Sequence, residues 1–186
     1  AGVDTGVDVT WRWTAADDGL RLALDVEPFG PRDVEWARVG VSFALRPGID
    51  DVQWHGRGPG PAYPDTGAAA VPGTYRASVA ELAERTVRPQ EAGSRADVRR
   101  ARLRRDDEPV VEIDALPPVA LTVRPWSTER LAAATHDHEL VGDGATHVVL
   151  DLAQNGVGTA ACGPDVLEPY RLAARRVTGT LVFRVP

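Results

Sequence analysis

Leu20-Arg21-Leu22-Ala23-Leu24-Asp25-Val26 alternates large apolar residues with small or charged ones along its whole length. A repeat of two places the leucines on one face of a β-strand and the intervening residues on the other. The pair Asp18-Gly19 stands just before this run, and a second apolar stretch, residues 7–13, precedes the pair. Because Asp-Gly is a favoured turn between neighbouring strands, the two runs predict a β-hairpin.

The same alternation recurs at residues 39–45, where the run ends at Pro47-Gly48. Further strands are expected at residues 110–113, 119–123, 147–152, 170–174 and 178–185. Helical spacing occurs only at residues 127–135, where Ser127 or Thr128 would be the cap, and a short turn is expected at residues 79–85. Many short strands separated by turn residues predict an all-β fold, either an antiparallel sandwich or a barrel.

The composition indicates a single globular domain over residues 1–186. The chain carries a net charge of −6, and 43% of its residues are hydrophobic. It is long enough to bury its own core but too short for a TIM barrel, which needs about 250 residues. The acidic balance argues against a nucleic-acid partner, and no apolar run reaches the roughly 18 residues that would predict a membrane span.

Cysteine and methionine usage bear on the compartment and the origin of the chain. Cys162 is the only cysteine, which excludes an internal disulfide and a cysteine-rich zinc site. We find no signal peptide and expect a cytoplasmic protein. Because the sequence contains no Met, we expect that the chain was processed or was cut from a longer one.

Glycine and proline are concentrated at residues 56–73. The segment Gly56-Arg57-Gly58-Pro59-Gly60-Pro61 superficially resembles a phosphate-binding loop. Its prolines have no N–H for an anion, however, and the chain has no Lys. Tyr63 and Asp65 add a ring and a charge, so we expect an ordered loop that packs on another part of the domain.

Six arginines are concentrated at residues 95–105, and nearby acidic residues neutralise much of their charge. If this stretch is a strand, Val98 shares one face with Arg100, and Arg99 shares the other with Leu103. A solvated or ion-paired face is the favoured interpretation. A role in a cleft or a subunit contact remains the alternative.

Two further groups of reactive side chains have simple interpretations. His136-Asp137-His138 has the spacing of two metal ligands, but no third ligand is indicated, so a surface turn is favoured. Cys162 lies in Ala161-Cys162-Gly163-Pro164 without a nearby His, which argues against a nucleophile. Paired glycosidase carboxylates on separate strands leave no pattern in a sequence. The residues alone therefore assign no catalytic group.

Three segments together resemble a known family. Trp54-His55-Gly56-Arg57-Gly58-Pro59-Gly60-Pro61-Ala62-Tyr63-Pro64-Asp65 is similar to the W-x-G-x-G-P-x-E-x-Y-P-D signature in the C-terminal domain of bacterial β-galactosidases of glycoside hydrolase family 2. Val87-Arg88-Pro89-Gln90-Glu91-Ala92-Gly93-Ser94-Arg95-Ala96-Asp97-Val98-Arg99 resembles that domain's V-R-P-Q-E-N-G-x-R-T-D-V-R. The stretch at residues 152–165 resembles its glycine-rich segment, and the three motifs occur in the family's order.

The resemblance implies a large antiparallel β-sandwich of the supersandwich type, shared with galactose mutarotases. It also implies that the catalytic glutamates and the magnesium site of the enzyme lie in a central TIM barrel that this chain is too short to contain. The chain alone is therefore expected to hold no cofactor and to be inactive on its galactoside substrate. The expected partners are the remaining domains or a separate large subunit of the β-galactosidase.

In the family, two loops of this domain reach the active-site mouth. By resemblance, Glu91, Arg95, Asp97 and Arg99 are the candidate cleft-loop residues, although ion pairing that only holds the loop's shape explains them as well. Cys162 falls approximately where the best-known members have a Trp on which galactose stacks, and a thiol has no comparable flat apolar face.

A free-standing carbohydrate-binding domain or an aldose-1-epimerase-like sandwich is the alternative function. An epimerase needs a His and a Glu that exchange protons across the sugar ring. The histidines of this chain do not match that family's context. They are His55, His136, His138 and His147.

Overall fold

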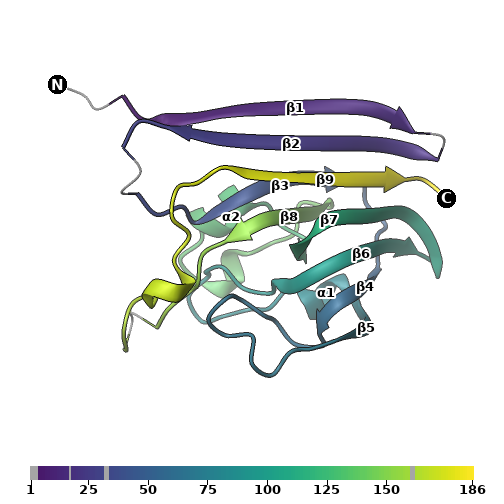
Figure 1. Ribbon diagram of the computed structural model, residues 1–186. Coiled ribbons are helices and arrows are strands. Elements are labelled where there is room, and N and C mark those ends of the chain that lie inside the picture. Colours follow the sequence, from purple (N-terminus) through teal and green to yellow (C-terminus); the bar gives the residue numbers. More distant parts are fainter. Residues whose placement is uncertain (1–3, 17, 32–33, 160–161) are drawn as a thin grey trace.

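The computed structural model describes residues 4–16, 18–31, 34–159 and 162–186. The elements follow one another along the chain in this order: β1 (Gly6–Ala16), β2 (Gly19–Phe29), β3 (Arg38–Leu45), β4 (Asp51–Gly58), β5 (Val71–Ser78), α1 (Val79–Leu82), β6 (Arg95–Arg105), β7 (Glu108–Arg124), α2 (Thr128–Ala133), η1 (Asp137–Glu139), β8 (Thr146–Gln154), η2 (Glu168–Tyr170) and β9 (Val177–Arg184). Figure 1 shows the strands stacked across the molecule, with β1 at one edge. None of the helices in these ranges is long and apolar enough to cross a membrane.

The nine strands form one continuous antiparallel sheet, with the order β1-β2-β9-β7-β6-β4-β5 and a branch in which β7 pairs with β8 and β8 pairs with β3. The branch arises because β7 is long enough to serve two partners. Its residues 112–116 pair with β9, whereas its residues 120–124 pair with β8. On one side of β7 the sheet therefore splits into two layers, which we call the β1-β2-β9 leaf and the β3-β8 leaf, while β6, β4 and β5 continue it on the other side.

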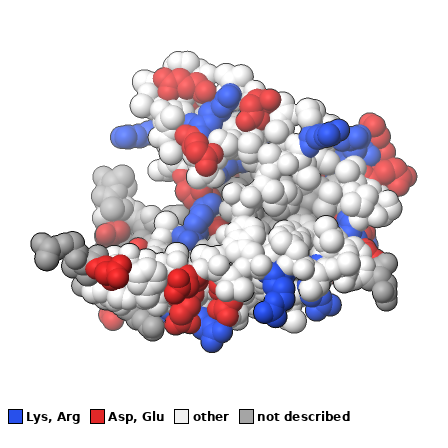
Figure 2. Space-filling view, turned by 90° about the horizontal axis from the view of Figure 1, so that it is seen from above, with Lys and Arg blue, Asp and Glu red and all other residues white. Residues whose placement is uncertain are grey.

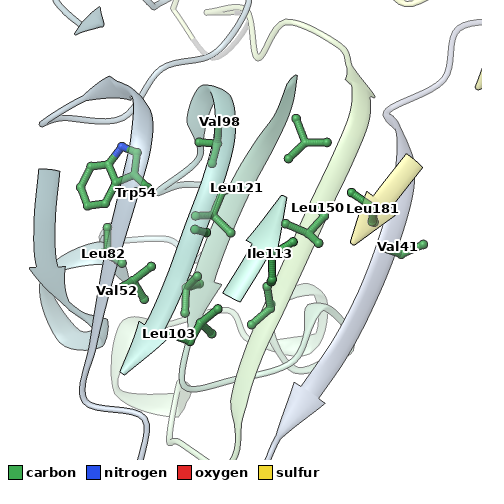
Figure 3. Packing of buried hydrophobic residues seen from close by; sticks show 14 of the residues in the cluster. Val41, Val52, Trp54, Leu82, Val98, Leu103, Ile113, Leu121, Leu150 and Leu181 are labelled. Atoms are coloured by element: carbon green, nitrogen blue, oxygen red, sulfur yellow. The ribbon is translucent and has the colours of Figure 1, made fainter. Parts of the chain in front are cut away.

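The two leaves face each other across the main core (Figure 3). Leu22 and Leu181 from the first leaf and Val41 and Leu150 from the second are buried in this core. At Gly179 the leaves come so close that a Cβ atom would lie 2.3 Å from Leu152 Cδ2. The predicted all-β antiparallel sandwich is therefore confirmed.

The local predictions also hold at several elements. The Asp18-Gly19 hairpin is β1 and β2, paired in register from Gly6 and Phe29 to Ala16 and Gly19. Ser127 caps α2 by accepting a hydrogen bond from Arg130 N at 3.2 Å. The expected turn at residues 79–85 contains α1, and Ser78 and Glu81 form a capping box at its start.

Three predictions on the strands are wrong. The expected strand at residues 170–174 is instead the end of η2 followed by an irregular segment, in which Leu172 N donates to the Asn155 side chain. The separate strands at residues 110–113 and 119–123 form one strand, β7. Pro117-Pro118 fits inside β7 because the described pairing with β9 ends at Leu116 and the pairing with β8 begins only at Ala120, so neither ladder uses an N–H from these prolines.

The third correction concerns β6. The pairing of β6 with β7 shifts register around Val98, which lets Val98 join Ala101 and Leu103 in the core. A bulge of this kind reverses the alternation, so Val98 does not share a face with Arg100. The arginines that face outward, Arg100 and Arg102, pair with carboxylates of β7, as the ion-paired interpretation predicted.

Candidate functional site

The three motif segments meet around one hollow of about 540 Å³. The β4–β5 connection, the start of β6 and the end of β8 supply most of its wall. The lining residues that bear polar groups are Arg57, Tyr63, Asp65, Asp97, Asp151, Gln154 and Tyr170. Segments about 60 residues apart in the chain therefore share one edge of the fold.

Asp65 joins the first motif to the glycine-rich one. Its two carboxylate oxygens accept hydrogen bonds from Val157 N at 3.0 Å and from Gly158 N at 2.7 Å. Gly158 adopts a φ of 61°, a left-handed conformation that favours glycine. Asp65 is thus a clamp that holds the glycine-rich loop against the β4–β5 connection.

Tyr63 joins the first motif to the second. Its hydroxyl donates to Glu91 Oε1 at 3.1 Å and accepts from Ser94 N at 3.3 Å. The ring is buried. Burial is the main reason why the pKa of Tyr63 is raised, and the Glu91 carboxylate raises it further. The hydroxyl therefore remains a hydrogen-bond donor at any physiological pH. The contacts of Tyr63 and Asp65 confirm the prediction that this loop is ordered and packs on another part of the domain.

Glu91 also belongs to a partly buried ionic cluster. Arg38 Nη2 lies 2.8 Å from Glu91 Oε2, and Arg124 Nη1 lies 3.6 Å from the same oxygen. Arg38 also approaches Asp151 Oδ2 at 3.7 Å. Burial lowers the pKa of Arg124. Two guanidinium groups and two carboxylates therefore hold β3, β7 and β8 to the loop that carries Glu91.

Asp151 is the most buried member of this cluster, with 2% of its surface exposed. Its Oδ2 accepts from Gln154 Nε2 at 3.3 Å, while its Oδ1 has no hydrogen-bond partner among the described residues. Burial and repulsion from Glu91 raise the pKa of Asp151 to about 7, although Arg38 and Arg124 act to lower it. The hollow therefore has in its wall a carboxyl with a pKa near neutrality, whose unpaired Oδ1 is itself buried.

Arg95 has a supporting position beneath the loop. The side chain is 5% exposed, and it donates to Pro59 O at 3.1 Å and Gly93 O at 2.7 Å. Its guanidinium lies over the Trp54 ring, 5.7 Å from the centroid. Burial lowers its pKa. Arg95 thus fixes the backbone of the first two motifs and is not available to a ligand.

Asp97 is exposed at the rim of the hollow. Its carboxylate accepts from Arg57 Nε at 2.7 Å, and Arg57 also donates to Ala70 O at 3.0 Å. Asp97 has a φ of 55°, which few non-glycine residues adopt. The pair is solvent-accessible, so its polar atoms are available to a ligand or to a neighbouring domain.

Arg99 lies apart from this group, and Cys162 follows the clamped loop without lining the hollow. Arg99 lines a second hollow, of about 400 Å³, together with His55 and Arg100. Cys162 is exposed, and its N–H donates to Thr159 O at 3.0 Å in the turn after the glycine-rich loop. The structure therefore brings Glu91, Arg95 and Asp97 to one edge and places Arg99 over another face.

Sequence reasoning missed Arg38, Arg124 and Asp151. The signal for Asp151 was a carboxylate inside the apolar run at residues 147–152, which is costly unless it is paired. Arg124 is the last residue of β7 and precedes Pro125, and Arg38 is the first residue of β3. Neither position differs in sequence from that of an ordinary surface arginine.

The arrangement supplies hydrogen-bonding groups to its hollow. Carboxylate, amide and phenol groups of this kind can bind hydroxyl groups. Within the described ranges, no group of three or more His, Cys, Asp or Glu residues could hold a metal ion. The fixed loops and their polar side chains together shape a polar hollow at this edge of the fold.

Comparison with known proteins identifies relatives of this chain. The sequence model of the β-galactosidase small chain matches residues 2–183. A β-galactosidase of Arthrobacter sp. (strain B7) is 38% identical over 191 residues, which cover 100% of this chain and 18% of that protein. A β-galactosidase of Staphylococcus xylosus is 27% identical over 91% of this chain and 17% of its own length. A β-galactosidase of Priestia megaterium (strain DSM 319 / IMG 1521) is 33% identical over a region that covers 67% of this chain and 12% of that protein. The chain therefore spans less than a fifth of the length of these relatives.

Proposed function

Because the chain belongs to the β-galactosidase small-chain family, we propose that it acts as the C-terminal domain of a retaining β-galactosidase. The whole enzyme would hydrolyse terminal β-D-galactosides. In this proposal the edge that carries the motif hollow forms part of the active-site mouth, and other faces pack on the rest of the enzyme. The relatives extend well beyond the matched region, which supports the presence of such further domains.

The observation that carries the proposal is the Asp65 clamp. It fixes the glycine-rich loop to the connection that Tyr63 fixes to Glu91. One edge of the domain thus presents three loops whose relative positions are set by buried or charge-assisted hydrogen bonds. A site that orients a sugar needs such preorganised walls.

In this proposal the catalytic carboxyl groups belong to the rest of the enzyme, and this chain supplies part of the cleft wall. A retaining glycosidase uses two carboxyl groups about 5 Å apart, one as acid/base and one as nucleophile, through a covalent glycosyl-enzyme intermediate. We place this pair and the magnesium ion in the catalytic barrel of the whole enzyme, and we assign this chain no catalytic residue and no cofactor. We also place the protein in the cytoplasm, because a single cysteine precludes internal disulfides.

Cys162 would be the residue of this chain nearest to the galactoside. Its side chain is exposed at the turn next to the clamped loop. A thiol cannot offer a sugar the flat apolar face of an aromatic ring. We therefore propose that Cys162 lines the mouth without stacking, and that galactoside contact from this loop is weak.

The epimerase-like alternative is not favoured by the matched proteins, which are β-galactosidases. Its chemistry also finds little support in the histidines. His136 Nδ1 lies 3.3 Å from Glu139 Oε1 at one exposed turn, so no sugar ring fits between them. His55 bonds to Thr74, and His147 bonds to Asp143.

A hybrid enzyme tests the proposal. In this hybrid, the present chain replaces the aligned region of the Arthrobacter sp. (strain B7) β-galactosidase. We expect the hybrid to hydrolyse a nitrophenyl β-galactoside, and we expect Cys162→Trp in the hybrid to lower KM about fivefold, the effect of about 1 kcal/mol from a new ring–sugar contact. Cys162→Ser is the matched control and should leave KM unchanged. A hybrid that folds but has no activity, or a KM that Cys162→Trp leaves unchanged, would contradict the proposal.

A further inference from the structure

The core-facing side of β1 is only partly covered. Val7, Val9, Trp11 and Trp13 alternate along the strand, and they stand opposite Pro28, Val26, Leu24 and Leu22 of β2 in the register. Directly opposed residues of paired strands share a face. Leu22 and Leu24 are buried in the core, yet Trp11 and Trp13 remain 52% and 50% exposed.

The cause is an unequal number of strands in the two leaves. Residues of β2 and β9 share the main core with residues of β3 and β8, whereas no described residue of β1 belongs to that core. Among the described strands, β3 pairs only with β8, so its other edge is open, as is the outer edge of β1. The inner face of β1 thus lacks the strand that would lie opposite it.

The missing strand leaves an apolar groove of about 570 Å³ between the leaves. Val9 and Trp11 form one wall, and Trp36 and Val39 form the other, where Glu35 and Arg38 add one charge of each sign. Figure 2 looks down on the β1 edge and shows a broad uncharged surface there, flanked by acidic and basic side chains. Exposed apolar surface of this extent marks an interaction site.

The open edge and the groove together define what would fill them. A strand added to the open edge of β3 would satisfy backbone groups there and would place every second side chain against β1. A second copy of the chain is a poor occupant, because an isologous dimer would set the same groove against itself. The relatives continue for more than four-fifths of their length outside the matched region, so the rest of the enzyme has ample chain to supply such a strand.

We propose that the groove between β1 and β3 receives a β-strand from another part of the β-galactosidase, which extends the β3 leaf and covers Trp11 and Trp13. This inference rests on the proposed function, since it takes the partner to be the remainder of that enzyme. The strand has apolar residues at alternate positions facing β1. The groove is a structural interface; it shares Arg38 with the ionic cluster and Leu152 with the motif hollow, but Asp65 does not line it.

Hydrogen exchange read by mass spectrometry tests the proposal in the hybrid enzyme and in the isolated chain. We expect the amides along the open edge of β3, which the added strand would bond, to exchange at least about 100-fold more slowly in the hybrid, and the amides of β1 to be protected with them. Trp11→Lys and Trp13→Lys should abolish this protection. Thr10→Lys and Thr14→Lys lie on the opposite face of the same strand, and they should leave it intact. Isolated chains that already protect β1 as a dimer, or equal exchange rates in hybrid and isolated chain, would overturn the proposal.

This readout is independent of activity. A hybrid that protects β1 but does not hydrolyse galactosides would refute the proposed function and leave the interface standing. If the hybrid does not fold, overlapping peptides from the rest of the Arthrobacter enzyme decide the question on the isolated chain. At least one peptide should bind, and Trp11→Lys should weaken that binding more than about 30-fold, as expected for a central Trp. The absence of any such peptide would overturn the proposal.

Discussion

Replacing Asp65 by Ala removes the clamp between the β4–β5 connection and the glycine-rich loop. The wild-type carboxylate accepts hydrogen bonds from Val157 N at 3.0 Å and Gly158 N at 2.7 Å. Hydrogen bonds to a charged group contribute about 1.5–3 kcal/mol each. The Val157 bond is exposed to water, which replaces much of what is lost there, so we expect a total loss of about 2 kcal/mol.

The loss should be local. A change of about 2 kcal/mol corresponds to a factor of about 30 in the opening equilibrium of the loop. The amides of Val157 and Gly158 should therefore exchange about 30-fold faster in the Asp65→Ala variant, while core amides of β8 should change only as far as global stability does. Asp65→Asn keeps one acceptor oxygen and should give an intermediate effect.

NMR-detected hydrogen exchange on the isolated chain measures this effect residue by residue. Asp50→Ala is the matched control, because Asp50 accepts from Asp106 N at 3.0 Å in the turn between β6 and β7. It should loosen that turn and leave Val157 unchanged. If Asp65→Ala leaves exchange at Val157 and Gly158 within about twofold of wild type, the clamp does not hold the loop and the reasoning is refuted.

Three further predictions concern the ionic cluster, the supporting arginine and the isolated chain. The pKa of Asp151 is about 7 in the folded state against an ordinary 3.8, so the folded protein binds this proton more tightly than the unfolded chain does. Protonation of Asp151 therefore stabilises the fold at low pH, and this stabilisation is lost as pH rises from about 4 to 7. Asp151→Asn should therefore gain stability relative to wild type between pH 5 and pH 8, on the order of 2 kcal/mol by urea unfolding, and a pH-independent difference would contradict this. Arg95→Met leaves Pro59 O and Gly93 O without their buried donor and should lower the free energy of unfolding by about 3 kcal/mol. The control Arg100→Ala breaks a surface ion pair with Asp114 and should lower it by less than about 1 kcal/mol. Equal losses of stability in the two variants would argue against the supporting role of Arg95. The isolated chain should not hydrolyse a nitrophenyl galactoside, and turnover by a preparation free of contaminating enzyme would refute the assignment of catalysis to another domain.

Local patterns predicted much of the fold because many strands have one buried and one exposed face. The alternation at residues 20–26 and the Asp-Gly turn identified the first hairpin, and the pair Ser127-Thr128 identified the start of α2, of which Ser127 is the cap. The pattern failed where tertiary structure overrides it. Pro117-Pro118 reads as a break, yet it lies where β7 changes partners, and the bulge at Val98 reverses the alternation of β6.

The site was predictable only in part. The motif resemblance led to Glu91, Arg95 and Asp97, which the structure places at one edge of the fold. Arg38 and Arg124 could not be found, because their role depends on which strands meet behind the loop. Arg95 was expected to face the cleft, but it is buried under Pro59 and supports the backbone instead. A sequence motif identifies Arg95 as a candidate, but it does not show whether the side chain faces the cleft or the interior.

Alkylation of Cys162 in the hybrid enzyme tests the central claim most directly, namely that this edge of the domain lies at the galactoside site. The thiol is exposed in the isolated chain, and mass spectrometry of its peptide reports its reaction with iodoacetamide separately from that of every other cysteine. We predict that a non-hydrolysable thiogalactoside slows the alkylation of Cys162 at least about fivefold in the hybrid and has no effect on the isolated chain, which lacks the barrel. An alkylation rate in the hybrid that saturating thiogalactoside leaves unchanged would contradict the account.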